Sequence, residues 1–224
     1  MEDLTLIIPA KFESESLPIF FKEIQHLNCK KIIILEENDY QTINSTKNFE
    51  GIKIHYQKNK GYGSAIIEGI KITNTRLFCI INADGSMDPN YLDEMKDKIE
   101  SQNLDFLFAS RYEKPGGGSD DDNLITFVGN YFFTKIGNIF FSLKITDILY
   151  TYVMGKTLSF NNLNIISKDF TLCVEFPIKA NRKGYKLGTS PSYERNRIGG
   201  KKKVNAFKDG LLILIKMIKM FIQK

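Results

Sequence analysis

The chain has few cysteines and lacks long uncharged runs. Cys29, Cys79 and Cys173 stand far apart among apolar residues, which favours reduced core thiols in a cytosolic protein over a disulfide framework or a zinc site. No stretch of 18 or more residues is free of charge, so we expect no membrane-spanning helix. Met1 to Pro9 has neither a basic start nor a cleavage site, so we expect no secretory signal.

The motifs of several enzyme classes are also missing. There is no G-x-S-x-G elbow and no Ser/His/Asp cluster, which argues against a hydrolase. Lys60-Gly61-Tyr62-Gly63-Ser64 lacks both the P-loop ending and the full G-x-G-x-x-G spacing, and is either a plain turn or a place where backbone approaches a phosphate. His26 and His55 have no partner pattern, so we expect both to be structural.

The composition is that of a globular chain with an uneven charge. Apolar residues make up 42% and charged residues 25% of 224 residues, which fits one α/β domain with a C-terminal extension. The net charge is +5, but residues 195–224 hold nine Lys or Arg and one acid, a net of +8. Such a basic tail attracts phosphates, anionic lipid headgroups or nucleic acid, or simply forms a solvated surface.

Short apolar runs alternate with helical patterns along the first half of the chain. This alternation predicts an α/β fold with a mostly parallel sheet and helices on both faces. Ligands bind such sheets at the carboxyl ends of the strands. The predicted strands are residues 4–9, 31–35, 52–56, 77–81 and 104–109, and the predicted helices are 14–27, 64–72, 89–99, 124–141, 170–183 and 204–222.

The segment from Asn82 to Pro89 is the clearest candidate for chemistry. Carboxylates two residues apart at a strand end can hold a divalent cation, which then holds a diphosphate. Here Asn82 offers a neutral oxygen at the first position and Asp84 a carboxylate at the second. Asp88 and Pro89 also fit a plain helix start, with Asp88 as the N-cap. Glu36 and Glu37, at another strand end, could bind a base or ribose or could be solvated.

In order along the chain, these segments resemble the family-2 glycosyltransferases of the GT-A fold. They look most like the branch of dolichyl-phosphate mannose synthase and the bacterial polyprenyl-phosphate sugar transferases. The resemblance runs from Leu4 to about Gly210. It is carried by Ile7-Ile8-Pro9-Ala10-Lys11-Phe12-Glu13, Leu35-Glu36-Glu37-Asn38-Asp39, Asn59 to Ala65, Asn82-Ala83-Asp84-Gly85-Ser86-Met87-Asp88-Pro89, Ala109-Ser110-Arg111-Tyr112 and Arg195-Asn196-Arg197-Ile198-Gly199-Gly200-Lys201.

The resemblance implies a role for each matching residue. The nucleotide would be bound by Pro9, Ala10, Glu13, Glu37, Lys60, Asn82 and Asp84. Mg²⁺ or Mn²⁺ would be held by Asp84, Asn82 and Ser86. Catalysis would depend on Asp84 together with phosphate-binding cations at Arg111, Arg195, Arg197 and Lys201. Two departures stand out: Asn82 replaces the family's first Asp, and Asn123 to Gly129 contains no basic residue where the family has an arginine.

The tail combines charge with an apolar stripe. Val204, Phe207, Leu211, Leu214, Ile215, Ile218 and Ile222 recur at helical spacing beside several lysines. This pattern predicts an amphipathic helix that lies on an anionic membrane surface, or that packs on the domain or on a second copy in a homo-oligomer. We therefore divide the chain into a GT-A domain, residues 1–200, and a basic amphipathic helix, residues 201–224. Within the domain, the loop from Arg111 to Asn123 holds three glycines and three consecutive aspartates, so we expect it to be a mobile lid.

We therefore expect an inverting transferase that moves a sugar from a nucleotide-sugar to a polyprenyl-phosphate or glycan acceptor, in the synthesis of surface polysaccharide or glycolipid. It would act in the cytoplasm, peripherally at the inner face of the membrane. A sugar-phosphate nucleotidyltransferase is the alternative, although Ala10 to Ser16 lacks the glycine-rich loop which that class needs. A catalytically degenerate nucleotide binder is another. Nucleic-acid binding is not expected, because no groove-reading motif is present.

Overall fold

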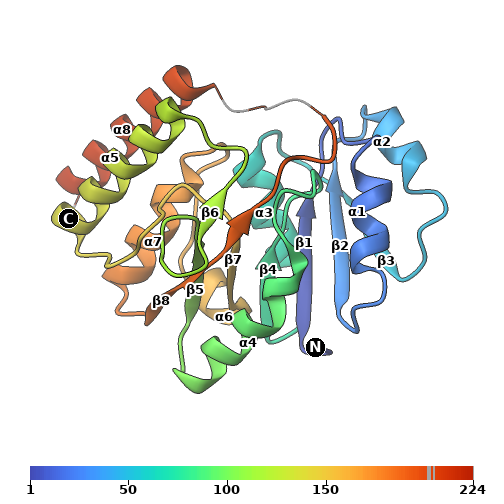
Figure 1. Cartoon of the computed structure of the whole chain (residues 1–224), viewed down its shortest axis with the longest axis horizontal. Helices are drawn as coiled ribbons and strands as arrows, with labels where there is room; N and C mark the ends of the chain where they lie inside the picture. The colour runs from blue at the N-terminus through green and yellow to red at the C-terminus, as the bar shows by residue number, and fades with distance from the viewer. Residues whose placement is uncertain (201–202, 204, 224) are drawn as a thin grey trace.

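A computed structural model describes residues 1–200, 203 and 205–223. A single sheet of seven strands runs through the molecule in the order β3-β2-β1-β4-β7-β5-β8 (Figure 1). Neighbouring strands are parallel except at β7, which is antiparallel to both β4 and β5. The predicted α/β fold with a mostly parallel sheet is confirmed. The strands are β1 (Leu4–Pro9), β2 (Lys30–Leu35), β3 (Ile52–Tyr56), β4 (Leu77–Ile80), β5 (Phe106–Ser110), β7 (Val153–Lys156) and β8 (Leu187–Pro191).

Helices cover both faces of this sheet, because its strands alternate apolar side chains to two sides. Leu4, Leu6 and Ile8 of β1 belong to a core with α1 and α4, whereas Ile7 belongs to a second core with α3, α5, α6, α7 and α8. The helices are α1 (Leu17–Ile24), α2 (Tyr40–Ser45), α3 (Tyr62–Lys71), α4 (Leu92–Ser101), α5 (Leu124–Phe141), α6 (Thr157–Asn161), α7 (Leu172–Arg182) and α8 (Ala206–Ile222), and the 3-10 turn Pro89–Tyr91 precedes α4.

Several elements differ from the sequence predictions. The patterns after residue 118 did not predict β7 or β8, nor the two-stranded ladder of β6 (Gly118–Ser119) and β9 (Tyr193–Glu194). The short β7 contains Gly155, where a Cβ would lie 2.4 Å from Phe106 Cδ1. Its sequence therefore reflects close packing against β5, and it lacks the apolar pattern by which a strand is predicted. Asp88 caps the turn before α4 as predicted, since its side chain accepts a hydrogen bond from Asn90 N at 2.9 Å.

Helix α8 lies beside α5 at one end of the molecule (Figure 1) and shares the core of the domain. Its buried side chains are Ile213, Met217 and Met220. The predicted stripe instead faces outward: Phe207, Leu211, Ile215 and Ile218 are exposed, and Leu214 is partly buried. Val204 lies outside the described residues. None of the described helices is both long enough and apolar enough to cross a membrane.

Candidate active site

The carboxyl ends of β1, β2 and β4 meet at one edge of the sheet, as parallel pairing requires. Pro9 and Ala10 end β1, and Ala10 N donates to Ile34 O at 3.0 Å. At the end of β2, Glu36 is buried and accepts a hydrogen bond from Lys11 Nζ at 2.7 Å, whereas Glu37 is exposed. This edge therefore carries the predicted nucleotide-binding segments side by side.

The glycines before α3 serve the fold more than a ligand. Gly61 has a φ of 112°, and a Cβ there would lie 2.2 Å from Lys168 O. A Cβ on Gly63 would lie 2.4 Å from Ser167 O. The close approach that these glycines permit is therefore to residues 167–169 of the chain itself, and Lys60 beside them is exposed. This packing supports the plain-turn interpretation of the segment over the phosphate-binding one.

Asp84 is the carboxylate at the end of β4, and it is 4% exposed. Its Oδ1 accepts hydrogen bonds from Ser86 N at 3.1 Å and Ser86 Oγ at 2.9 Å. Its Oδ2 faces Arg197 Nη1 at 2.9 Å. Ser86 thus holds Asp84 in place, while the other carboxylate oxygen points at a positive charge. Asp84 is therefore held rigidly and paired with a cation of the chain itself.

Asn82 is oriented by a tyrosine that sequence reasoning did not single out. Tyr62 Oη donates to Asn82 Oδ1 at 2.9 Å and lies 2.6 Å from Thr151 Oγ1. Burial is the main reason that the pKa of Tyr62 is raised, so this hydroxyl stays protonated and can donate. The Tyr62 ring stacks on Phe170 with centroids 4.7 Å apart. The tyrosine of the Gly-Tyr-Gly segment therefore fixes the amide that replaces the family's first aspartate.

No group of three His, Cys, Asp or Glu side chains that could hold a metal is present among the described residues. Asp84 supplies one carboxylate, Asn82 one amide oxygen and Ser86 a hydroxyl that donates to Asp84. A site with one or two protein oxygens fits Mg²⁺ or Mn²⁺, because such ions take their remaining ligands from substrate phosphates and water. The residues present therefore fit an ion that arrives with a nucleotide.

Residues 195–200 and 203, here called the C-terminal strap, pass across this edge of the sheet. Arg195 Nη2 lies 2.9 Å from Glu23 Oε2 and 2.7 Å from Gly85 O. Ile198 N donates to Asp84 O at 2.9 Å, and Lys203 pairs with the buried Glu13. The strap thus covers the segment around Asp84. Lys201 lies outside the described residues.

Arg197 of the strap bridges two acids. Besides Asp84, its Nη2 lies 3.4 Å from Asp121 Oδ2. Burial acts to lower the pKa of Arg197, but the charges of Asp84 and Asp121 outweigh this effect and raise it. The resemblance assigns Arg197 to phosphate binding, but in the structure this arginine pairs with two carboxylates of the site. The Arg197 guanidinium therefore joins Asp84 to Asp121. The run of aspartates in the sequence could not show that Asp121 lies near Asp84, because this depends on the fold.

Arg111 is held inside the domain. Its Nε lies 2.7 Å from Asp147 Oδ2 and its Nη1 lies 3.1 Å from Glu194 Oε2, with the side chain 9% exposed. Burial opposes the charge, but Asp147 and Glu194 together raise the pKa of Arg111 well above its ordinary value. This arrangement ties the end of β5 to β9. Its charge is therefore balanced by carboxylates of the chain itself.

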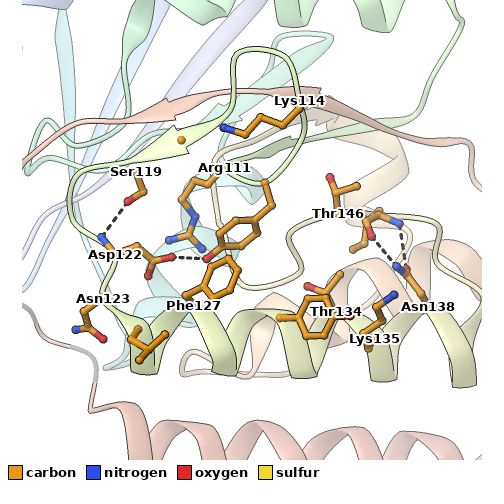
Figure 2. Close-up of a pocket in the computed structure, with 15 residues that line it drawn as sticks. Arg111, Lys114, Ser119, Asp122, Asn123, Phe127, Thr134, Lys135, Asn138 and Thr146 are labelled. Carbon is orange, nitrogen blue, oxygen red and sulfur yellow. Dashed lines mark hydrogen bonds between the residues drawn. The ribbon is translucent and has the colours of Figure 1, made fainter.

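Two cavities adjoin this site. The larger, of about 740 Å³, lies between the loop 111–123 and α5, and Figure 2 shows Lys114 on the loop above Phe127 and Lys135 of the helix. The loop is tied down here, because Tyr112 Oη donates to Asp122 and Asp122 N donates to Ser119 Oγ at 3.0 Å. The smaller cavity, of about 370 Å³, is lined by Asn82, Arg111 and Arg197 and extends to α5 and α8.

The chain is similar to several known proteins. It is 26% identical over 97 residues to an uncharacterised glycosyltransferase of Mycobacterium tuberculosis and to one of Mycobacterium bovis, and each match covers 43% of this chain and 44% of the relative's length. Glucosyl-3-phosphoglycerate synthase of Mycobacterium tuberculosis, in complex with Mn²⁺, UDP and glucosyl-3-phosphoglycerate, has the same fold, with a TM-score of 0.72 at 10% identity over 96% of this chain and 78% of that one. Its complex with Mg²⁺ and UDP gives a TM-score of 0.68 at 9% identity, over 96% and 78% of the two chains.

The family itself is established by sequence. The profile described as Glycosyl transferase family 2 matches residues 5–163, a range that runs from β1 through β7 and includes Asp84. This range covers more than half of the chain. The structural neighbours share the mostly parallel sheet seen here, which is the fold of the GT-A class. The chain therefore belongs to glycosyl transferase family 2.

Proposed function

We propose that the chain transfers a sugar from a nucleotide-sugar donor to an acceptor, with inversion at the anomeric carbon. The observation that carries this proposal is the buried Asp84 at the end of β4, whose Oδ2 faces a cation at 2.9 Å. Family membership favours sugar transfer over the nucleotidyl transfer considered from the sequence. Solved neighbours contain UDP or UDP-glucose with Mn²⁺, which supports a nucleotide-sugar as the donor.

The chemistry follows from where charge develops. In a single displacement, negative charge grows on the departing nucleoside diphosphate, and a divalent ion held at Asp84 would neutralise part of it. Arg197 would leave Asp84 as the ion enters and could then pair with the diphosphate. Tyr62 would orient Asn82, and Ser86 would hold Asp84, through the hydrogen bonds described above. Arg195 lies next to Gly85 and would close the strap over the donor.

A hydroxyl acceptor needs a general base, and Asp121 is the candidate. It shares Arg197 with Asp84, so it lies on the far side of that guanidinium from the proposed metal position. A sugar whose diphosphate bound at Asp84 would reach toward Asp121. A phosphate acceptor, as the dolichyl-phosphate resemblance would imply, is already ionised and would need no base.

The outer surface of α5 and α8 supports contact with a membrane. Both helices expose large apolar side chains, and residues 195–224 hold nine Lys or Arg against one acid. Phe140 of α5 and Phe221 of α8 pack with ring centroids 5.5 Å apart, so the two helices form one continuous surface. An apolar face beside lysines is the pattern of helices that lie in a membrane interface. A peripheral position on an anionic membrane is therefore part of the proposal.

The test is the binding of UDP, GDP, CDP and dTDP, each with and without Mn²⁺, measured by thermal unfolding. At a ligand concentration 100 times its Kd, binding adds about 2.7 kcal/mol, which is roughly 5–10 °C for a chain of this size. Asp84→Asn should abolish the Mn²⁺-dependent shift and sugar transfer. Asp88→Asn is the matched control, because Asn also caps a helix and Asp88 lies outside the proposed metal position.

Two outcomes would separate the remaining alternatives. An Asp84→Asn variant that keeps full Mn²⁺-dependent binding would contradict the metal assignment. If the wild-type chain binds a nucleotide but transfers no sugar from any donor, it is the catalytically degenerate nucleotide binder considered from the sequence. Asn82→Asp should tighten Mn²⁺ binding, since it adds an anionic ligand while Tyr62 can still donate to it.

A further inference from the structure

Phe12 is an exposed aromatic residue at the carboxyl edge of the sheet. It follows the last residue of β1 by three positions and is 63% exposed. Among the described residues, no other aromatic ring packs against it. β1 and α2, which flank it, lie on the other side of the molecule from α5 and α8 (Figure 1), so Phe12 is not part of the apolar surface proposed to contact a membrane. Neither core packing nor that surface explains why an aromatic ring stands here.

The backbone of Phe12 adopts a left-handed conformation, with a φ of 52°. A bulky residue rarely adopts this conformation, because its side chain crowds the backbone. The turn is fixed by the start of α2, since Phe12 N donates to Asp39 Oδ2 at 2.6 Å and Glu13 N donates to Thr42 Oγ1 at 2.9 Å. Asparagine or glycine would form the same turn with less strain. Strained residues of this kind occur mainly at binding sites, so the position points to a ligand that contacts the ring.

A lysine packs over one side of the Phe12 ring. Lys11 Nζ lies 5.5 Å from the centroid of this ring and 2.7 Å from Oε1 of the buried Glu36, which follows β2. The ion pair with Glu36 therefore helps to hold Lys11 against the ring. Phe12 is 63% exposed even with Lys11 in this position, so part of the ring remains open to a ligand. An open aromatic face is a stacking platform for a nucleobase, because every base has a π face of its own.

The C-terminal strap relates the position of Phe12 to that of Asp84. Ile198 N donates to Asp84 O at 2.9 Å, and a Cβ on Gly200 would lie 3.7 Å from Phe12 O. One residue separates Ile198 from Gly200, so their Cα atoms lie at most about 7 Å apart. The base and the 5′-diphosphate of a nucleotide are separated by a single ribose, which is a spacing of the same order. A nucleotide whose diphosphate lies at Asp84 could therefore place its base on Phe12.

We propose that the base of the donor nucleotide stacks on Phe12, with Lys11 on the opposite side of the ring. The inference rests on the proposed function, because it names the residue that binds the base of that donor. It adds Lys11 and Phe12 to the nucleotide site, neither of which the family resemblance assigned to it. Stacking requires only a π face, so Phe12 contributes affinity for whichever base the site accepts.

The test compares nucleoside diphosphates with pyrophosphate, which carries the diphosphate without a base. UDP, GDP, CDP, dTDP and pyrophosphate are each titrated with Mg²⁺ into the full chain, and binding is measured by calorimetry. In Phe12→Ala, affinity for the nucleotide that the wild type binds most tightly should fall at least about fivefold, while affinity for pyrophosphate stays unchanged. Phe12→Tyr should bind as the wild type does, because it keeps the ring. Equal loss for nucleotide and pyrophosphate, or no loss for the nucleotide, would overturn the proposal.

A further variant separates stacking from folding. Phe12→Asn should raise the unfolding temperature, because Asn tolerates a positive φ, and should weaken nucleotide binding as much as Phe12→Ala does. Lys144→Asn is the matched control, since Lys144 is also exposed and has a φ of 56° but follows α5. It should raise the unfolding temperature and leave nucleotide binding unchanged. Wild-type affinity in Phe12→Asn would reject the stacking inference alone, whereas a wild-type chain that binds none of the four nucleotides would reject the proposed function as well.

Discussion

Replacing Arg197 by alanine should make Mn²⁺ bind more tightly in the absence of nucleotide. In the structure, the guanidinium lies 2.9 Å from Asp84 Oδ2 and pairs with a carboxylate oxygen that the proposed ion would need. Asp84 itself is 4% exposed, so water replaces the lost cation poorly. The ion entering the wild-type site has to displace Arg197, and in the variant it does not.

The size of the effect follows from the burial of this pair. Two unit charges 2.9 Å apart attract by roughly 6 kcal/mol at an effective dielectric of about 20, and desolvation offsets most of that. Exposed pairs contribute up to about 1 kcal/mol, and breaking a buried pair costs about 3–5. The Arg197 side chain is 22% exposed, so an intermediate net value of about 2 kcal/mol is appropriate. Removing this competition should tighten Mn²⁺ binding about 30-fold.

The assay is the titration of Mn²⁺ into nucleotide-free protein, with free Mn²⁺ measured by electron paramagnetic resonance. Arg76→Ala serves as the control, because Arg76 also pairs with two carboxylates, Asp3 and Glu100, but lies away from the site. That variant should bind Mn²⁺ as the wild type does. In Arg197→Ala, sugar transfer should fall even though the metal binds better, because the diphosphate loses a cation. Unchanged or weaker Mn²⁺ binding would refute the competition.

Three further outcomes are expected. Burial acts to raise the pKa of Glu175, but bonds from Lys179, Ser167 and Lys216 outweigh it and lower the pKa to about 2. The unfolded chain therefore takes up this proton first as the pH falls, so up to about 3 kcal/mol of stability should be present above about pH 4.5 and be lost toward pH 2. In Glu175→Gln, the free energy of unfolding measured with urea should fall less between about pH 4.5 and pH 2 than it does in the wild type. Amides of the loop 111–123 should exchange faster than those of β5 in the free protein and slow down with donor and acceptor bound, and a loop already as protected as β5 would contradict the lid. Phe207→Glu, at a side chain that is 82% exposed, should leave the unfolding temperature unchanged and reduce sedimentation with anionic vesicles, whereas unchanged sedimentation would argue against membrane contact through α8.

Local pattern predicted five strands of the sheet and most of the helices, but not β7 or β8. Strands such as β1 and β4 are short apolar runs that are buried on both faces, and helices such as α5 repeat apolar residues along their length, so both types could be predicted from sequence. Motif order then placed Asp84 at a strand end and indicated the family. These features depend on neighbours within one segment, which is the information that a sequence displays directly.

Tertiary structure alone decided how the charged residues are used. Arg111 and Arg197 looked like phosphate ligands in sequence, but folding brings Asp147, Glu194 and Asp121 against them from segments far along the chain. Sequence likewise could not show that Asn130 Oδ1 has no hydrogen-bond partner among the described residues, because this depends on every element around it. Likewise, α8 has apolar residues on two sides, so its periodicity could not show which side faces the core. Ion pairs, cavities and exposed faces are set by contacts between distant segments, and only packing fixes those contacts.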